Sequence, residues 1–162
     1  MDLEARAHAE HPDALRLWLR MMTCTQLVEK KIRDGLREQF TTTLPRFDLM
    51  AQLDRSPQGL RMSELSSRLM VTGGNVTGLT DSLEAEGLVV RESDGSDRRA
   101  LRVKLTREGR RAFRTMAAEH ERWIAEVFAG LSAREARSLA ERLHTLKQHI
   151  LDNVPLDERG RQ

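Results

Sequence analysis

Two short helical patterns joined by only two residues constrain the fold of this chain more than any other feature. The first pattern covers residues 63–70 and the second covers residues 73–86. Thr72 stands where a helix N-cap is expected, and Gly87 is the residue type that most readily ends a helix in the left-handed conformation. Two short helices with so tight a connection are typical of a helix-turn-helix.

The second of these helices has an unusual polar face. Its apolar residues form one narrow stripe at helical spacing: Val76, Leu79 and Leu83. The opposite face is predicted to carry short side chains with little charge: Asn75, Thr77, Gly78, Thr80, Asp81 and Ser82. A solvated helix usually displays Glu and Lys there, whereas short hydrogen-bonding side chains let a helix backbone approach DNA base edges. The pattern therefore favours a recognition helix over a connector whose polar face simply meets solvent.

A β-hairpin is predicted directly after this pair of helices. Residues 88–91 have the composition of a strand, and residues 101–105 alternate apolar with basic side chains. Between them lies the polar loop ESDGSDRRA, and a hairpin in this place is a wing. Residues 91–114 carry nine basic and four acidic side chains, a net charge of +5 in a chain of +2 overall. This local excess suits contact with a phosphate backbone.

The segment GLVVRESDGSDRRALRVKLTREG resembles the wing and the following helix start of the MarR family of winged-helix regulators. The shared features are an Asp-rich wing, a D-x-R step and the motif L-T-x-x-G, and the resemblance covers about residues 15–151. It implies a mainly α fold with a small β-hairpin wing, in which a winged helix-turn-helix domain is flanked by N- and C-terminal dimerisation helices. It also implies a dimeric DNA-binding regulator, expected to be a repressor that binds a palindromic operator in double-stranded DNA.

The helix-turn-helix supplies the first candidate DNA contacts. We expect Asn75 and Thr77 to contact base edges, followed by Thr80 and Asp81, because Asn suits adenine and Thr suits the thymine methyl group. Phosphate contacts are expected from the preceding helix, at Ser63, Ser66, Ser67 and Arg68. Three further positions complete this predicted surface: Thr72, Gly74 and Gly78.

The wing supplies the second set of candidates. Guanidinium groups favour the narrow minor groove of A/T-rich DNA, so Arg98 and Arg99 are candidates for that groove. The resemblance implies that Arg99 enters the minor groove and that Asp97 braces it, with Arg98 in the variable middle position of the D-x-R step. The alternative is a solvated charged loop.

The segments on both sides of this module are long and helical. A hydrophobic content of 39% with 4% aromatic and 32% charged residues favours helices, and charged helices of this kind often complete their burial against a second chain. We expect an N-terminal dimerisation helix over residues 14–40, buried on more than one side, and the winged helix-turn-helix over residues 41–105. Two C-terminal dimerisation helices follow over residues 106–152, between flexible ends at 1–13 and 153–162. A monomeric bundle is the alternative.

Two caps and one apolar stripe define the C-terminal helices. Thr106 is predicted to accept a hydrogen bond from Gly109, and Ser132 with Glu135 forms a predicted capping box. The last helix is expected to direct four apolar side chains inward: Leu139, Leu143, Leu146 and Ile150.

The resemblance further implies a ligand pocket between the dimerisation helices and the DNA-binding module. The candidates near that junction are Trp18, Met22, Thr25, Phe40, Pro45, Arg46, Phe47, His120 and Trp123. Arg46 beside aromatic side chains suits a carboxylate or phosphate. The run TLPRFDLM, with WLRMM before it and HERWI after it, is similar to MarR-type repressors that respond to aromatic acids or their coenzyme A thioesters, the hydroxycinnamoyl-CoA group above all. Ordinary core packing is the alternative.

Cys24, the only cysteine, suggests a redox sensor as a second alternative. One branch of the family senses peroxides with a cysteine on its first helix, but it uses tyrosines that this chain lacks, and Lys30 and Lys31 are almost two turns away. A buried, unreactive thiol is therefore expected.

Other function classes find little support. The N-terminus lacks an apolar run and no segment approaches a membrane span, so a cytoplasmic protein is expected. No catalytic, metal or cofactor motif stands out. A winged-helix dimer that binds proteins without sequence-specific DNA recognition remains an alternative. The net charge of +5 over residues 91–114 favours DNA binding instead.

Overall fold

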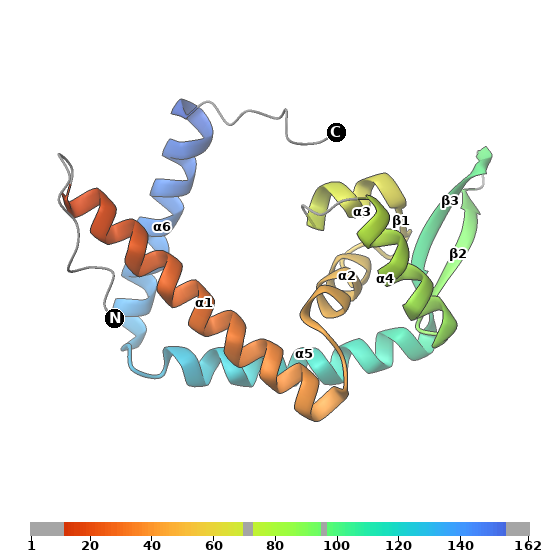
Figure 1. The fold of residues 1–162 in the computed structure, drawn as a ribbon, viewed down its shortest axis with the longest axis horizontal. Helices are drawn as coiled ribbons and strands as arrows, with labels where there is room; N and C mark the ends of the chain where they lie inside the picture. The colour runs from red at the N-terminus through yellow and green to blue at the C-terminus, as the bar shows by residue number, and fades with distance from the viewer. Residues whose placement is uncertain (1–11, 70–72, 95–96, 155–162) are drawn as a thin grey trace.

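The computed structural model describes residues 12–69, 73–94 and 97–154 (Figure 1), and the side chains of residues 94 and 97–100 are not described. The elements are α1 (Pro12–Phe40), α2 (Leu44–Asp54), β1 (Leu60–Arg61), α3 (Met62–Leu69), α4 (Gly73–Ala85), β2 (Val89–Asp94), β3 (Asp97–Leu105), α5 (Arg107–Phe128) and α6 (Ala133–Asn153). The predicted class, mainly α with a small β-hairpin wing, is confirmed. Within the described ranges, no helix is long and apolar enough to cross a membrane.

The predicted hairpin belongs to a three-stranded antiparallel sheet of order β1-β3-β2. In the hairpin, Val89 pairs with Leu105 and Arg91 pairs with Val103. The short β1 pairs its Leu60 with Val103 from the other side. The sequence prediction missed β1, because two residues are too few to show an alternating pattern.

The core lies between the helix-turn-helix, the sheet and the middle of α5. Apolar residues of α2, α3, α4 and the sheet are buried in it, among them Leu49, Leu53, Leu65, Val76, Leu83, Val89 and Val103. The two ends of the predicted α4 stripe, Val76 and Leu83, are fully buried. Burial of such a side chain stabilises the fold by about 1.5–3 kcal/mol. The helix-turn-helix is therefore fixed to the sheet through one side of α4.

The start of α5 is joined to the turn between α4 and β2. Thr106 caps the helix as predicted, because its Oγ1 accepts a hydrogen bond from the Gly109 N–H at 2.9 Å. The same hydroxyl donates to the carbonyl of Gly87 at 2.7 Å, and the Thr106 N–H donates to the carbonyl of Leu88 at 3.0 Å. Gly87 has φ of 71°, the left-handed conformation expected of it.

Close packing explains why residue 109 is a glycine. A Cβ atom built on Gly109 would lie 1.9 Å from the carbonyl oxygen of Leu88, a distance that no side chain tolerates. The L-T-x-x-G motif therefore combines a helix cap at Thr106 with a close approach of α5 to the backbone of Leu88.

Helices α1 and α5 also cross closely. A Cβ on Gly35 would lie 2.6 Å from the ring of Trp123, so glycine lets the indole rest on the α1 backbone. Trp123 is 2% exposed, and the Phe40 ring lies 6.4 Å from it. The C-terminal third of α1 is thereby fixed to α5, and Ile32 and Leu36 are its buried residues.

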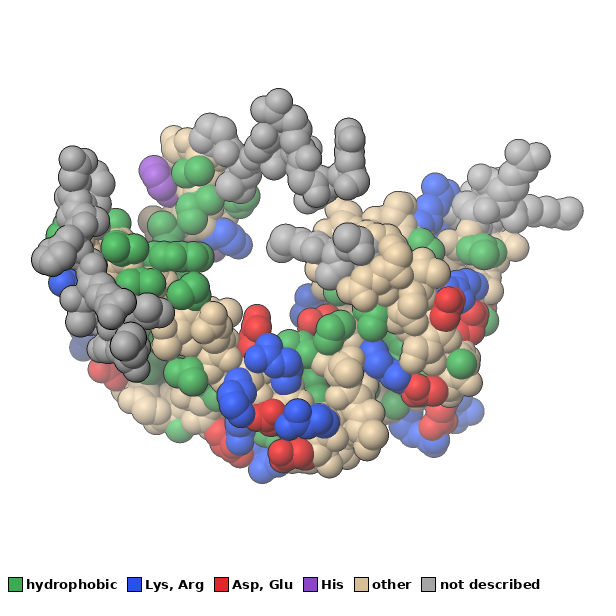
Figure 2. Space-filling model, viewed as in Figure 1, with side chains coloured by type: hydrophobic (Ala, Val, Ile, Leu, Met, Phe, Trp, Pro, Cys, Tyr) green, Lys and Arg blue, Asp and Glu red, His purple; other side chains and the backbone are tan. Residues whose placement is uncertain are grey.

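The outer helices leave apolar faces open within one chain. Helix α6 has no buried residue, and Leu139 and Leu143 are 44% and 40% exposed, so the side chains predicted to point inward do not pack against the rest of the same chain. Leu17 and Trp18 of α1 are 52% and 58% exposed, so one chain does not supply the predicted burial of α1 on more than one side. Figure 1 shows α6 and the first half of α1 on one side of the molecule and the wing on the other, and Figure 2 shows apolar side chains lying open over α1 and α6.

The close contact at Gly109 predicts a specific loss of stability. We expect Gly109→Ala to lower the free energy of unfolding by about 1–3 kcal/mol or more, because the added methyl group must displace the Leu88 backbone. Gly130→Ala, at the other end of α5, is the matched control, since no atom lies within 4 Å of its added Cβ. Urea unfolding of the two variants measures the difference, and equal stabilities would refute the packing argument.

Candidate nucleic-acid interface

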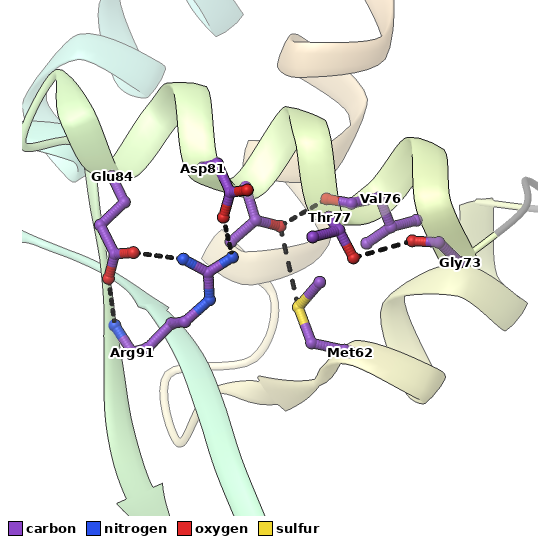
Figure 3. A network of polar contacts seen from close by, with 8 residues as sticks. Met62, Gly73, Val76, Thr77, Asp81, Glu84 and Arg91 are labelled. Atoms are coloured by element: carbon purple, nitrogen blue, oxygen red, sulfur yellow. Dashed lines mark hydrogen bonds and ion pairs between the residues drawn. The ribbon is translucent and has the colours of Figure 1, made fainter.

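Helix α4 presents a polar, nearly uncharged face to solvent. Asn75, Thr77 and Gly78 are exposed, as predicted. The Thr77 hydroxyl donates to the carbonyl of Gly73 at 3.0 Å, which holds this side chain against its own helix (Figure 3). Added Cβ atoms on Gly73, Gly74 and Gly78 would meet nothing within 4 Å among the residues that the structure describes. The packing of the chain therefore does not require glycine at these three positions.

Thr80 does not belong to this face, and its prediction as a base-contacting residue is wrong. Thr80 is 0% exposed, and its hydroxyl donates to the carbonyl of Val76 at 2.7 Å and lies 3.8 Å from the sulfur of Met62. The physical reason is the helical period, because position 80 follows Val76 by four residues and precedes Leu83 by three. A buried hydroxyl bonded inside its own helix cannot contact a base.

Asp81 is exposed but already has a partner. Arg91 of β2 binds Asp81 and Glu84 together, which joins α4 to the wing (Figure 3). Sequence reasoning missed Arg91 and Glu84 as site residues. The sequence did contain a signal for this contact. Asp81 and Glu84 are three residues apart and share a helix face, and Arg91 lies in the predicted strand that follows.

The predicted phosphate-contacting residues lie on α3. Ser63, Ser67 and Arg68 are exposed and Ser66 is partly exposed. The Arg68 guanidinium donates to the Ser56 hydroxyl at 3.1 Å, so it is held near the turn before β1. Thr72 lies outside the described residues. Asp97, Arg98 and Arg99 lie in β3, but their side chains are outside the described part of the chain, so their predicted roles stay predictions.

The predicted ligand-contacting residues divide into two groups. At the junction of α2 and α5, the Phe47 ring lies 5.4 Å from Phe113 and 5.0 Å from His120, centroid to centroid. Phe47 and Trp123 are buried, and Phe40 is partly buried. Phe113 of α5 also belongs to this cluster and was not among the predicted ligand-contacting residues. Burial raises the pKa of the neighbouring Asp48 carboxyl, and the charge of His120 opposes that rise.

The second group lies on the N-terminal half of α1 and does not join the first within one chain. Trp18 and Phe40 are 22 residues apart on this helix, a separation of about 33 Å at 1.5 Å per residue. Trp18 and Thr25 are exposed and Met22 is partly exposed. Cys24 is exposed too, so the expectation of a buried thiol is wrong for the single chain.

Arg46 is mostly buried and paired within the chain. Its guanidinium donates to Glu86 at 2.5 Å and to the Ser82 hydroxyl at 3.0 Å, and its side chain is 17% exposed. The hydrogen bond from Arg46 lowers the pKa of the Glu86 carboxyl. The carboxylate on Arg46 is therefore that of Glu86, just after α4, and the predicted contact of Arg46 with a ligand stays a prediction. Pro45, the neighbouring candidate, is exposed.

Comparison with known proteins agrees with this geometry. A sequence profile of the MarR family matches residues 40–100. The uncharacterised HTH-type transcriptional regulator YkoM of Bacillus subtilis is 35% identical over 127 residues, which cover 76% of this chain and 80% of YkoM. The structure of a MarR family regulator from Silicibacter pomeroyi is 31% identical with a TM-score of 0.74, and the match covers 89% of this chain and 99% of that one.

A DNA complex is among the similar structures. Sco3205 of Streptomyces coelicolor, a MarR family regulator solved with DNA, is 25% identical with a TM-score of 0.72, and the match covers 86% of this chain and 92% of that one. The fold, the exposed face of α4 and these similarities define a winged helix-turn-helix DNA-binding protein. The chain belongs to the MarR family of transcriptional regulators. The similar proteins are regulators rather than enzymes.

Proposed function

We propose that the protein is a homodimeric repressor that binds a palindromic operator and is released from it by a small aromatic acid or its coenzyme A thioester. The observation that carries the DNA-binding part is the exposed face of α4, where Asn75 and Thr77 stand beside glycines that the chain's own packing does not need. A smooth face of this kind lets the helix backbone approach base edges in a major groove.

The wing completes the proposed DNA contact. We assign Arg99 to the adjacent minor groove, with Asp97 as its brace and Arg98 at the groove edge. Ser63, Ser66 and Arg68 of α3 then contact the phosphate backbone, which fixes the position of α4 without reading sequence. The excess of basic residues over 91–114 supports this arrangement.

Asn75→Ala tests the proposed groove contact. The probe is the duplex that the wild-type protein enriches most from a randomised pool. Loss of the Asn75 amide should weaken binding to this duplex by about 1–3 kcal/mol and relax the preference at one base position. Asn153→Ala, an exposed asparagine on α6, is the matched control. Fluorescence anisotropy measures the affinity of both variants. If Asn75→Ala bound every duplex with unchanged affinity, the proposed placement of α4 in the groove would be wrong.

The dimer is supported by the apolar surface of the outer helices. Exposed Leu139, Leu143 and Leu151 of α6 and Leu17 and Trp18 of α1 form an area that one chain leaves in water. Large apolar areas on a soluble chain mark contact surfaces. Two copies joined there would carry two α4 helices, which matches the two half-sites of a palindrome.

Leu143→Glu tests this assembly. A carboxylate in the apolar stripe of α6 should be costly to bury, so we expect a monomer in sedimentation analysis. Loss of the second half-site should weaken binding to the selected duplex by about a hundredfold or more. Gln148→Glu adds the same charge to the opposite, exposed side of α6 and should remain a dimer. A Leu143→Glu variant that is still dimeric would place the interface elsewhere.

The effector part of the proposal depends on the junction of α2 and α5. The rings of Phe47, Phe113 and His120 gather there, and Arg46 lies on the next position of α2. Aromatic rings suit a planar acid, and in this proposal the acid's carboxylate replaces Glu86 on the Arg46 guanidinium. The exposed Cys24 supports the second candidate, in which oxidation of the thiol releases the DNA.

Two treatments separate these candidates. We expect benzoate, p-hydroxycinnamate or hydroxycinnamoyl-CoA to raise the melting temperature and to release the selected duplex in a mobility-shift assay. A ligand at a hundredfold excess over its Kd adds about 2.7 kcal/mol to the free energy of unfolding. Hydrogen peroxide should leave the complex intact. Release by peroxide that Cys24→Ser abolishes, without any response to the acids, would favour the redox candidate.

A further inference from the structure

Arg91 connects the wing to the recognition helix through three hydrogen bonds. Its backbone N–H, on β2, donates to Glu84 Oε1 at 3.1 Å, and its guanidinium Nη1 donates to Glu84 Oε2. The other guanidinium nitrogen, Nη2, donates to Asp81 Oδ1 at 2.5 Å. Figure 3 shows Arg91 reaching from the strand to both carboxylates along one side of α4. One side chain therefore holds two positions of the helix, one turn apart.

The burial of this group separates it from an ordinary surface ion pair. The side chain of Arg91 is 19% exposed, whereas those of Asp81 and Glu84 are 61% and 38% exposed. Exposed ion pairs contribute little because water competes for both partners. The Arg91 guanidinium is largely covered and donates through two different nitrogens. It therefore fixes the orientation of both carboxylates as well as their distance from the strand. A lysine ammonium lacks this planar fork.

The position of the group connects it with DNA binding. Asp81 is exposed on the same helix as Asn75 and Thr77, and Arg91 is the third residue of β2, the first strand of the wing. The angle between α4 and the wing decides whether both can enter adjacent grooves of one duplex. Two carboxylates close to phosphates also repel DNA, so they weaken binding unless they serve another purpose.

We propose that Arg91 is a positioning residue for operator recognition, which holds α4 at a fixed angle to the wing through Asp81 and Glu84. Asp81 then serves this alignment, in place of the base contact predicted for it. The proposal rests on the proposed function, because it concerns the distinction between an operator and other DNA. It predicts that losing either side of the contact lowers selectivity, even where the loss makes the DNA-facing surface more positive.

Three variants and one control test the proposal. Binding is measured to the duplex selected by the wild-type protein and to a scrambled duplex of the same composition. We expect Arg91→Gln to lower the affinity ratio of the two by about tenfold. The double variant Asp81→Asn with Glu84→Gln should lower the ratio similarly, while it binds the scrambled duplex at least as well as wild type. Arg91→Lys keeps the charge and should still lower the ratio.

The control is Lys104→Gln, which removes one positive charge from the same hairpin. Lys104 pairs with Glu92 across the strands at 2.8 Å. It should weaken binding to both duplexes alike and leave their ratio unchanged. Circular dichroism checks that each variant is folded at the assay temperature. If Arg91→Gln is unfolded there, Arg91→Lys and the double variant decide the question.

Two results would overturn the proposal. A double variant that keeps or raises the ratio would show that the carboxylates only repel DNA. A wild-type affinity ratio in the Arg91→Lys variant would show that the positive charge alone matters. Failure of the proposed function gives a different result, because the wild-type protein would then enrich no duplex from the randomised pool.

Discussion

The burial of one side of α4 is the constraint on which the rest of the structure depends. Val76, Thr80 and Leu83 are fully buried against the helix-turn-helix core and the sheet. This fixes the rotation of the helix about its own axis, and so it decides which side chains are left for a partner. Asn75, Thr77 and Gly78 remain, and they are short and uncharged. The proposed recognition surface is therefore a consequence of packing as much as of its own residue types.

The features that local chemistry controls could be predicted from the sequence. Helix ends at Gly87, Thr106 and Ser132 are as expected, because caps and left-handed turns depend on neighbouring residues alone. The environment of Thr80 could not be predicted from its polarity, since a hydroxyl bonded to the carbonyl four residues before it is compatible with a core. Strand β1 forms by pairing with β3, some forty residues later in the chain, so no local sequence signal predicts it.

The outer helices show a different limit. The sequence shows the apolar spacing of α6. Such spacing predicts that one helix face will be buried, but it does not identify the element or chain that covers the face. In one chain the face of Leu139 and Leu143 lies open, and the same holds for Trp18 of α1. The core of the DNA-binding module is complete without these residues. The chain thus contains a module whose core forms within one copy and an apolar surface that one copy leaves in contact with water.

The acidic residues near the end of α4 are paired within the chain, which is how a helix proposed to face DNA can carry them. Asp81 and Glu84 are held by Arg91 from the wing, and Glu86 is held by Arg46 from α2. Each arginine is more buried than its carboxylate partners, so the two contacts act as attachment points with a defined direction. The C-terminal half of α4 is consequently tied to two elements that approach from different parts of the fold. Helix α4 is thus joined to α2 through Arg46 and to the wing through Arg91, so a shift of either element relative to α4 must break one of these contacts.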